Sequence, residues 1–425
     1  MKPVAYIVLT GGLFAVVCSV SVFGREPSGG STPPSLWERD TLTNNWFGLG
    51  EKLEDIGLSV GLGATQVYQH NLRGGAGTHR RAGRYTGSYD LELNVDLEKL
   101  AGLPGASMYL LAEGSWSDGI DASSIGSLFG VNDDAGGDRE IDVTELWYEQ
   151  ALLDGKLRIR AGKIDLTAGF ECRGLPSAFD GNAYANDETA QFLNGALVNN
   201  PTIPFPDNGL GVMAHLQPLE CWYLAAGVSD ARADARQTGF RTTFHDEDYF
   251  FSIFETGVVR HLPSANGDLP GAYRVGFWYD PQPKDRFDGR GTRRDDMGLY
   301  MTVDQSIFKE NDDAEDTQGL GVFARYGAAR SDVNEIRHFW STGAQYQGLI
   351  SGRDDDVLGF GVARGHLSSR AGFTSSQETA MELYYNARIT PWLNVSPSVQ
   401  YIFSPGGDHD VDDAVIAGIR LQISF

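Results

Sequence analysis

Apolar and polar residues alternate one by one along most of this chain, from about residue 57 to its carboxyl end. In the closing stretch AVIAGIRLQISF, Ile419, Leu421 and Ile423 fall on one face, and Arg420 and Gln422 fall on the other. A period of two residues is typical of a strand with one apolar and one wetter face. The same alternation recurs in SYDLELNVDLEKL, GLYMTVDQS and GKLRIRAGK.

Sixteen segments of this kind follow one another, most of them about ten residues long. That length suits a tilted strand that crosses a bilayer. The segments begin near Gly57, Gly87, Gly105, Glu140, Lys156, Asn208, Cys221, Tyr249, Gly271, Gly298, Gln318, His338, Val357, Gln377, Trp392 and Asp412.

The connections between these segments alternate in length. EKLAGLPG, LLDGK, LQPLE and ITPW are tight turns, whereas residues 71–86, 119–139, 166–207, 230–248 and 280–297 are longer and polar. Short turns at one end and long loops at the other are typical of an outer-membrane barrel. Only HLPSANGDLPG and KENDDAEDTQ are long for periplasmic turns.

The pattern therefore predicts an all-β fold: a transmembrane antiparallel up-and-down β-barrel of 16 strands, with short periplasmic turns and longer external loops. A soluble β-sandwich also alternates. The barrel is favoured because carboxylates and arginines occupy one face of sixteen long strands, and because the chain closes on Phe425. Arg420 and Gln422 are then expected to face the water-filled lumen, and the apolar face to meet lipid.

Three regions are expected along the chain. Residues 1–24 combine Lys2, an apolar middle and a small residue at Gly24, which is typical of a signal peptide cleaved near that position. Residues 25–56 form a periplasmic-side lead with a short amphipathic helix in NNWFGLGEKLEDIG. Residues 57–425 form the barrel. The predicted location is the bacterial outer membrane.

Charge and cysteine content narrow the partners. With a formal net charge of -23 the chain is a poor ligand for nucleic acid, whose phosphates require lysine and arginine. Cys172 and Cys221 remain after export, where a disulfide is chemically possible. The predicted topology places them near opposite ends of the barrel, so we expect them to be unpaired.

Nothing in the sequence indicates catalysis. It contains no G-x-S-x-G, H-E-x-x-H or Walker motif, and its eight histidines are scattered. The acidic segments KENDDAEDTQ and GRDDDV could offer oxygen ligands to a divalent cation, but neither matches a calcium loop. We expect solvated turns there and no bound metal. Because catalytic motifs are lacking, we also expect no enzyme activity and no cofactor.

The connection over residues 166–207 is the main candidate for a functional loop, since at roughly forty residues it is far longer than an ordinary hairpin loop. Its four phenylalanines make it too apolar to remain in water, so we expect it to fold into the lumen and narrow the channel. An external cap or a contact with a neighbouring subunit is the alternative. Folded inward, the loop would present Asn186, Asp187, Glu188 and the adjoining Asn208 to a solute.

The predicted lumen carries the groups that recognise sugars, namely aromatic faces for C–H surfaces and planar polar groups for hydroxyls. The residues predicted to line the pore on the strands are Glu113, Glu145, Trp147, Arg158, Arg160 and Trp278. Tyr109, Glu149, Arg274, Glu382, Tyr384 and Arg388 extend this set.

The chain resembles the carbohydrate-selective porins of the OprB type. The resemblance is carried by LTNNWFGLGEKLEDIGL, LWYEQALLDGKLRIRAGKIDL, ANDETAQFLNGALVNNPTIPFPDNGLG, GFWYDPQPK and TPWLNVSPSVQYIFSPGGDHDVDDAVIAGIRLQISF. It implies an outer-membrane barrel, often monomeric, that passes mono- or oligosaccharides by facilitated diffusion. It also implies that inward loops and lumen-facing charged and aromatic residues contact the solute. Among such residues, the matching segments contain Trp147, Arg158, Arg160, Asn186, Asp187, Glu188 and Asn208, and Glu145 directly precedes the second segment.

The expected mechanism is diffusion through a constricted pore with weak binding at several sites, because one tight site would trap the solute. The alternatives are a non-specific or ion-preferring porin, a barrel enzyme acting on lipid or glycan, and a secreted lectin. Expected partners are carbohydrate solutes, outer-membrane lipid and lipopolysaccharide, and the barrel-assembly machinery through Phe425. The chain is expected to act as a monomer or homo-oligomer.

Overall fold

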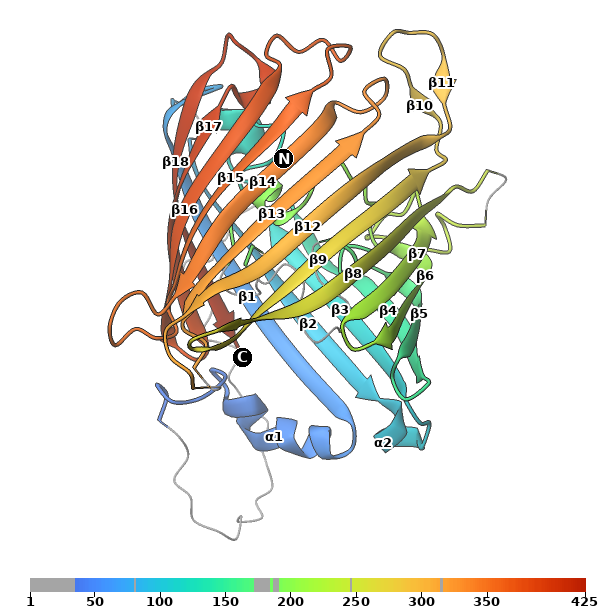
Figure 1. Ribbon diagram of the computed structural model, residues 1–425, viewed down its shortest axis with the longest axis vertical. Coiled ribbons are helices and arrows are strands. Elements are labelled where there is room, and N and C mark those ends of the chain that lie inside the picture. Colours follow the sequence, from blue (N-terminus) through green and yellow to red (C-terminus); the bar gives the residue numbers. More distant parts are fainter. Residues whose placement is uncertain (1–34, 80–81, 172–183, 186–190, 245–246, 314–315) are drawn as a thin grey trace, which may run out of the picture. The chain divides into compact units, whose positions relative to one another are not determined.

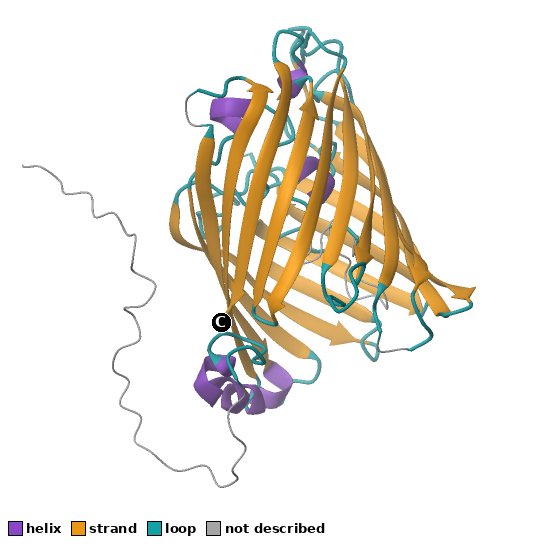
Figure 2. Ribbon diagram, turned by 90° about the vertical axis from the view of Figure 1, so that its left-hand side faces the viewer, coloured by secondary structure: helices purple, strands orange, loops and turns teal. Residues whose placement is uncertain are grey.

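A computed structural model describes residues 35–79, 82–171, 184–185, 191–244, 247–313 and 316–425. Within them, sixteen antiparallel strands close into one barrel, in which each strand pairs with its neighbours in the chain and β1 closes on β18 (Figures 1 and 2). The predicted fold class is confirmed. The barrel strands are β1 (Leu58–Gly75), β2 (Gly83–Asp96), β3 (Ala106–Trp116), β4 (Arg139–Leu152), β5 (Leu157–Ile164), β6 (Gly209–Leu219), β7 (Trp222–Asp230), β8 (Phe250–Ser264), β9 (Gly267–Asp280), β12 (Asp296–Lys309), β13 (Gly319–Ala329), β14 (Ile336–Gln347), β15 (Val357–Leu367), β16 (Gln377–Thr390), β17 (Leu393–Phe403) and β18 (Asp412–Ser424).

The remaining elements are short. The helix α1 (Asn44–Asp55) lies where the amphipathic segment predicts it, and β10 (Lys284–Asp285) pairs with β11 (Thr292–Arg293) in the loop between β9 and β12. Within the described ranges, no helix has the length and apolarity needed to cross a membrane. The other short helices are α2 (Leu97–Ala101), α3 (Gly195–Val198), η1 (Asp121–Ile125) and η2 (Pro405–Gly407).

The turn between β8 and β9 is shorter than its sequence pattern predicts. The segment HLPSANGDLPG is not a long turn, because β8 and β9 extend through it and pair as far as Ser264 and Gly267. Asn266 donates a side-chain hydrogen bond to the Lys309 carbonyl at 2.8 Å, which ties this hairpin to the next turn. By contrast, β12 ends at Lys309 and β13 begins only at Gly319, so the connection between these two strands is long, as predicted.

The two faces of the closing strand lie as the alternation predicts. Ile419 is 46% exposed on the outer surface, whereas Arg420 is 1% exposed inside the barrel. The Arg420 guanidinium donates to the Gln191 carbonyl at 2.7 Å and lies 3.5 Å from the Asp134 carboxylate. The expectation that Arg420 faces open water is therefore wrong, because a loop inside the barrel covers it.

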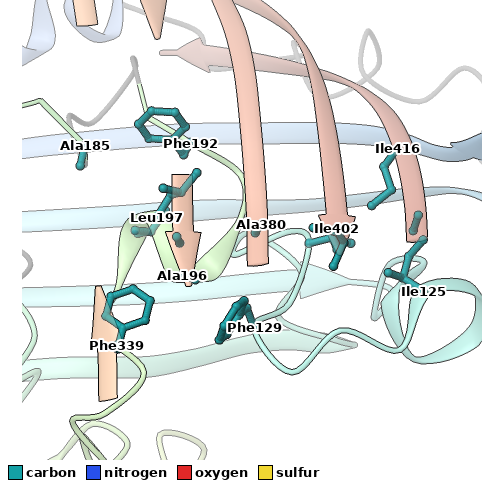
Figure 3. Close-up of a cluster of buried hydrophobic side chains, with 14 of the residues drawn as sticks. Ile125, Phe129, Ala185, Phe192, Ala196, Leu197, Phe339, Ala380, Ile402 and Ile416 are labelled. Carbon is teal, nitrogen blue, oxygen red and sulfur yellow. The ribbon is translucent and has the colours of Figure 1, made fainter. Parts of the chain in front are cut away.

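The barrel has a packed interior rather than an empty one (Figure 3). Phe192 and Leu197 of the long connection between β5 and β6 pack with Phe339 of β14 and Ala380 of β16 in one buried cluster. Phe129, from the loop between β3 and β4, belongs to the same cluster. In its described part, the long loop thus folds into the lumen as predicted, and a second loop that we expected to be external joins it.

Inward-facing glycines on β13 and β15 make room for these loops. A side-chain carbon at Gly327 would lie 2.0 Å from the Thr202 hydroxyl, which is far inside van der Waals contact. At Gly361 it would lie 2.8 Å from a methyl carbon of Leu197. The absence of a side chain at these two positions therefore allows the long loop to lie directly against the wall.

Candidate functional site

An aromatic and charged cluster lies on the inner face of β3, β4 and β5. The Tyr109 and Trp147 rings stack with centroids 5.0 Å apart, and the Arg160 guanidinium carbon lies 3.7 Å from the Trp147 ring centroid. The Trp147 indole N–H donates to the Glu145 carboxylate at 2.9 Å. These contacts fix the orientation of the indole plane.

Two arginines complete the cluster through one carboxylate. Glu149 accepts from Arg158 at 3.0 Å and from Arg160 at 3.1 Å. Strand register brings them together, since Tyr109 is opposite Trp147 and Glu149 is opposite Arg160. A planar guanidinium held by a carboxylate and stacked on an indole presents fixed N–H donors beside an apolar surface.

Further carboxylates line the neighbouring wall. Glu113 on β3 is the cross-strand partner of both Asp90 on β2 and Asp142 on β4, and it is half-buried on the inner face. Carboxylate oxygens are acceptors for sugar hydroxyls, and together they give this wall a negative field. The inner surface therefore places donors on β5 next to acceptors on β2–β4.

The structure brings four of the predicted strand residues into this cluster, namely Glu145, Trp147, Arg158 and Arg160, and places Glu113 on the adjoining wall. Asn208 lies immediately before β6, where its backbone N–H donates to the Asp207 carboxylate at 2.9 Å. Asn186, Asp187 and Glu188 lie outside the described residues.

Trp278 departs from the prediction. It points inward on β9 but is completely buried, with its ring stacked at 6.2 Å from Phe251 in a second apolar cluster that includes Ile203. The inward loop covers this part of the wall, so Trp278 does not line the pore.

Several inward charges hold loops rather than line the pore, and the sequence pattern did not distinguish the two roles. Glu382 on β16 accepts the backbone N–H groups of Leu193 at 2.9 Å and Asn194 at 2.8 Å. Arg325 on β13 donates to the carbonyls of Leu197 at 3.0 Å and Val198 at 2.8 Å. The expectation that Glu382 faces solute is therefore wrong.

Arg274 and Tyr384, which the sequence also predicts to line the lumen, are buried instead. Arg274 is buried against Asp304 at 2.5 Å, and Tyr384 is buried beside Phe192 with ring centroids 5.0 Å apart. For Glu382 one signal was present in the sequence: its cross-strand partner is the inward Gly361, and a glycine within a strand indicates a close approach of another segment.

The periplasmic end of the lumen contains a cavity of about 990 Å³. Tyr184 of the long loop lines it, together with Arg388 of β16 and Lys309 of β12. Because its lining includes Asp312, Asp316 and Pro391, which lie in turns at the periplasmic strand ends, the cavity lies below the inward loops on the short-turn side. Arg388 thus reaches water, as the sequence predicts.

The second inward loop contains a titratable group in a confined place. Burial raises the pKa of Asp121 to about 6, although the Ser127 N–H, which donates to this carboxylate at 3.1 Å, opposes the change. In the same loop, Ser127 and the Leu128 N–H donate to Glu378 of β16 at 2.5 and 3.1 Å. Among the described residues, no three His, Cys, Asp or Glu side chains are grouped as a metal site.

A closed sixteen-stranded barrel with an apolar outer face, a charged inner face and loops folded into its lumen defines a porin of the bacterial outer membrane. The OprB family model, described as carbohydrate-selective porin, matches residues 80–425. The chain therefore belongs to the OprB family of carbohydrate-selective porins, whose members are channels.

Individual relatives agree with this assignment. The chain is 25% identical to Porin B of Pseudomonas aeruginosa, over 93% of this chain and 92% of that protein. It is 22% identical to the putative porin QuiX of Acinetobacter baylyi, over 92% and 94%. The fold matches the high-pH structure of Pseudomonas putida OprB with a TM-score of 0.77 and 23% identity, over 91% of this chain and 99% of that one.

Proposed function

We propose that mono- or oligosaccharides cross this channel by facilitated diffusion and contact the Trp147 cluster on the way. The observation that carries the proposal is the geometry of Trp147, which is held by Glu145, Tyr109 and Arg160 on the inner face. The indole offers an apolar plane to sugar C–H groups, while Arg158, Arg160 and Glu113 offer donors and acceptors to hydroxyls. Contacts of this kind are weak individually, which allows release.

The proposal extends to residues of the long loop, namely Asn186, Asp187, Glu188 and Asn208, as further hydrogen-bonding partners of the solute. Their amide and carboxylate groups suit hydroxyls. The described part of the loop supports this, because it lies inside the barrel and its residue Tyr184 lines the lumenal cavity.

The experiment is sugar block of ionic current through the purified full chain in a planar bilayer. We expect maltose or glucose to reduce the current of the native protein, and Trp147→Ala to raise the half-blocking concentration roughly fivefold, as the loss of one aromatic contact of about 1 kcal/mol predicts. Trp222→Ala is the matched control, since Trp222 lies at the periplasmic end of β7 on the outer surface. An equal effect of both variants would contradict the proposal.

The main rival is an ion-preferring porin, which the carboxylates Asp90, Glu113 and Asp142 on one wall would favour. The reversal potential in a salt gradient separates the two. A strong cation preference with no block by any sugar would support the rival.

We also propose the cellular context of the barrel. Lys2 and the apolar stretch after it support a signal peptide removed near Gly24, although these residues lie outside the described part. The apolar outer face supports contact with membrane lipid and lipopolysaccharide, and Phe425 suits recognition by the barrel-assembly machinery. We propose a monomer or a homo-oligomer. Mass spectrometry of the mature chain and cross-linking in membranes test these points.

A further inference from the structure

A group of basic side chains lies on the outer surface of the barrel, where β14 and β15 meet the external loops. We define it as the β14–β15 patch, made of Arg337, His338, Arg364 and His366. His338 is the cross-strand partner of His366, and Trp340 is the partner of Arg364. Two strands thus gather positive charge at one place on a chain whose formal net charge is -23.

The alternation of faces shows which way the patch points. Phe339 and Ala363 are the sequence neighbours of His338 and Arg364, and both are buried in the apolar cluster inside the barrel. Arg337 lies at a register shift between Ile336 and His338, where strict alternation is interrupted, and it is exposed. Successive side chains of a strand point to opposite faces, so His338 and Arg364 lie on the lipid side. Further toward the periplasm on the same face, Phe360 is 47% exposed, as an apolar lipid-facing residue should be.

Aromatic residues mark the depth of the patch. The Arg364 guanidinium lies 5.6 Å from the Trp340 ring centroid, and the Tyr326 hydroxyl lies 3.0 Å from Nδ1 of His338. Tryptophan and tyrosine are enriched at the membrane–water interface. Because these strand ends lead into external loops, this is the interface of the outer leaflet. A lipid-facing arginine is destabilising near the midplane and tolerated near the interface.

The two arginines of the patch carry the positive charge that could receive an anion, and the two histidines add hydrogen-bonding groups beside them. The charged groups that act on His366 are Arg364, Arg337 and His338, all of them bases. Arg364 donates its Nε–H to the Thr379 hydroxyl at 2.8 Å, which positions its guanidinium on the surface. A guanidinium forms strong paired hydrogen bonds with a phosphate. The anion available at this depth of the outer leaflet is the phosphate of its glycolipid.

We propose that the β14–β15 patch binds a phosphate group of lipopolysaccharide in the outer leaflet. Bound lipid would neutralise the patch and fix part of the lipid layer against this side of the barrel. The patch is on the opposite face of the wall from the channel. Its failure to bind lipid would therefore leave the sugar-transport proposal untouched.

The test uses the full chain in nanodiscs of phosphatidylcholine doped with bisphosphorylated or with dephosphorylated lipid A, and native mass spectrometry of the lipid retained by the protein. We expect the native protein to prefer the bisphosphorylated form, and the double variant Arg337→Gln and Arg364→Gln to lose affinity for it on the order of tenfold. The single variant Arg364→Lys, which keeps the charge and leaves Arg337 in place, should retain part of the affinity that the double variant loses.

The matched control is Arg260→Gln, since Arg260 is an exposed arginine near the periplasmic end of β8. Heat-modifiable gel mobility verifies that each variant is a folded barrel. Equal retention of the two lipid forms by the native protein would overturn the proposal, as would unchanged retention by the folded double variant. Competition by millimolar inorganic phosphate alone, without a preference for lipid, would also overturn it, because the site would then bind free anion only.

Discussion

Glu382 is predicted to hold the long loop inside the barrel, and replacing it with alanine should release the loop without unfolding the barrel. The carboxylate is 1% exposed and accepts the N–H groups of Leu193 and Asn194. Asn194 also donates from its side chain to Gln400 at 3.1 Å. Glu382→Ala therefore leaves two backbone donors without their acceptor in a closed environment.

The magnitude follows from these contacts. A hydrogen bond to a charged group contributes about 1.5–3 kcal/mol, so two of them contribute about 3–6 kcal/mol to holding the loop. Water that enters the space left by the side chain replaces part of these two hydrogen bonds, so we expect a loss of about 3 kcal/mol. A loss of about 3 kcal/mol should increase opening of the loop roughly a hundredfold.

Hydrogen exchange of the full chain, followed by mass spectrometry, measures this opening directly. We expect the amides of residues 191–199 to lose about two decades of protection while those of β16 keep theirs, and single-channel conductance to rise. Glu382→Gln, which keeps one acceptor oxygen, should give a smaller change. Glu220→Ala, in the turn between β6 and β7, is the control. Unchanged protection of residues 191–199 in Glu382→Ala would refute the reasoning.

Three further predictions concern the loops and the wall. Gly327→Ala should displace the long loop and raise conductance, whereas Gly77→Ala, where a side-chain carbon has open space, should not. Burial raises the pKa of Asp121 from 3.8 to about 6 in the packed loop, so packing of this loop should strengthen as pH falls from about 6 toward 3.8 and weaken as pH rises. Hydrogen exchange at pH 5 and 7.5 measures this dependence, and Asp121→Asn should abolish it. Asp304→Ala leaves Arg274 buried without its partner and should lower barrel stability by about 3–5 kcal/mol, measured as a lower denaturant midpoint in guanidinium.

The sixteen strands and their faces are predictable because both are local properties of the chain. Residues two apart share a face, so an apolar series such as Ile419, Leu421 and Ile423 indicates a lipid-facing surface without knowledge of any partner. Turn composition then indicates which ends carry short connections. In the same way, Trp147 and Arg160 could be assigned to the lumen from their strands alone.

Which inward side chains reach the channel is a different question, and only the tertiary structure answers it. Glu149 and Glu382 both lie at inward positions, yet one holds the arginines of the candidate site and the other holds a loop. The contacts that separate them join distant parts of the chain: Glu382 and Leu193 are 189 residues apart. An inward glycine such as Gly361 indicates that some segment lies close to the wall, but no local pattern specifies which distant residue makes the contact.

Local patterns of the chain thus predict the barrel, its strand faces and the inward fold of the long loop. Long-range contacts, by contrast, bring the loop between β3 and β4 into the lumen, cover Trp278 and Arg420, and leave the wall of β2–β5 open. The physical reason is that alternation specifies a direction, inward or outward, whereas exposure inside a closed barrel depends on which other segments fill the space.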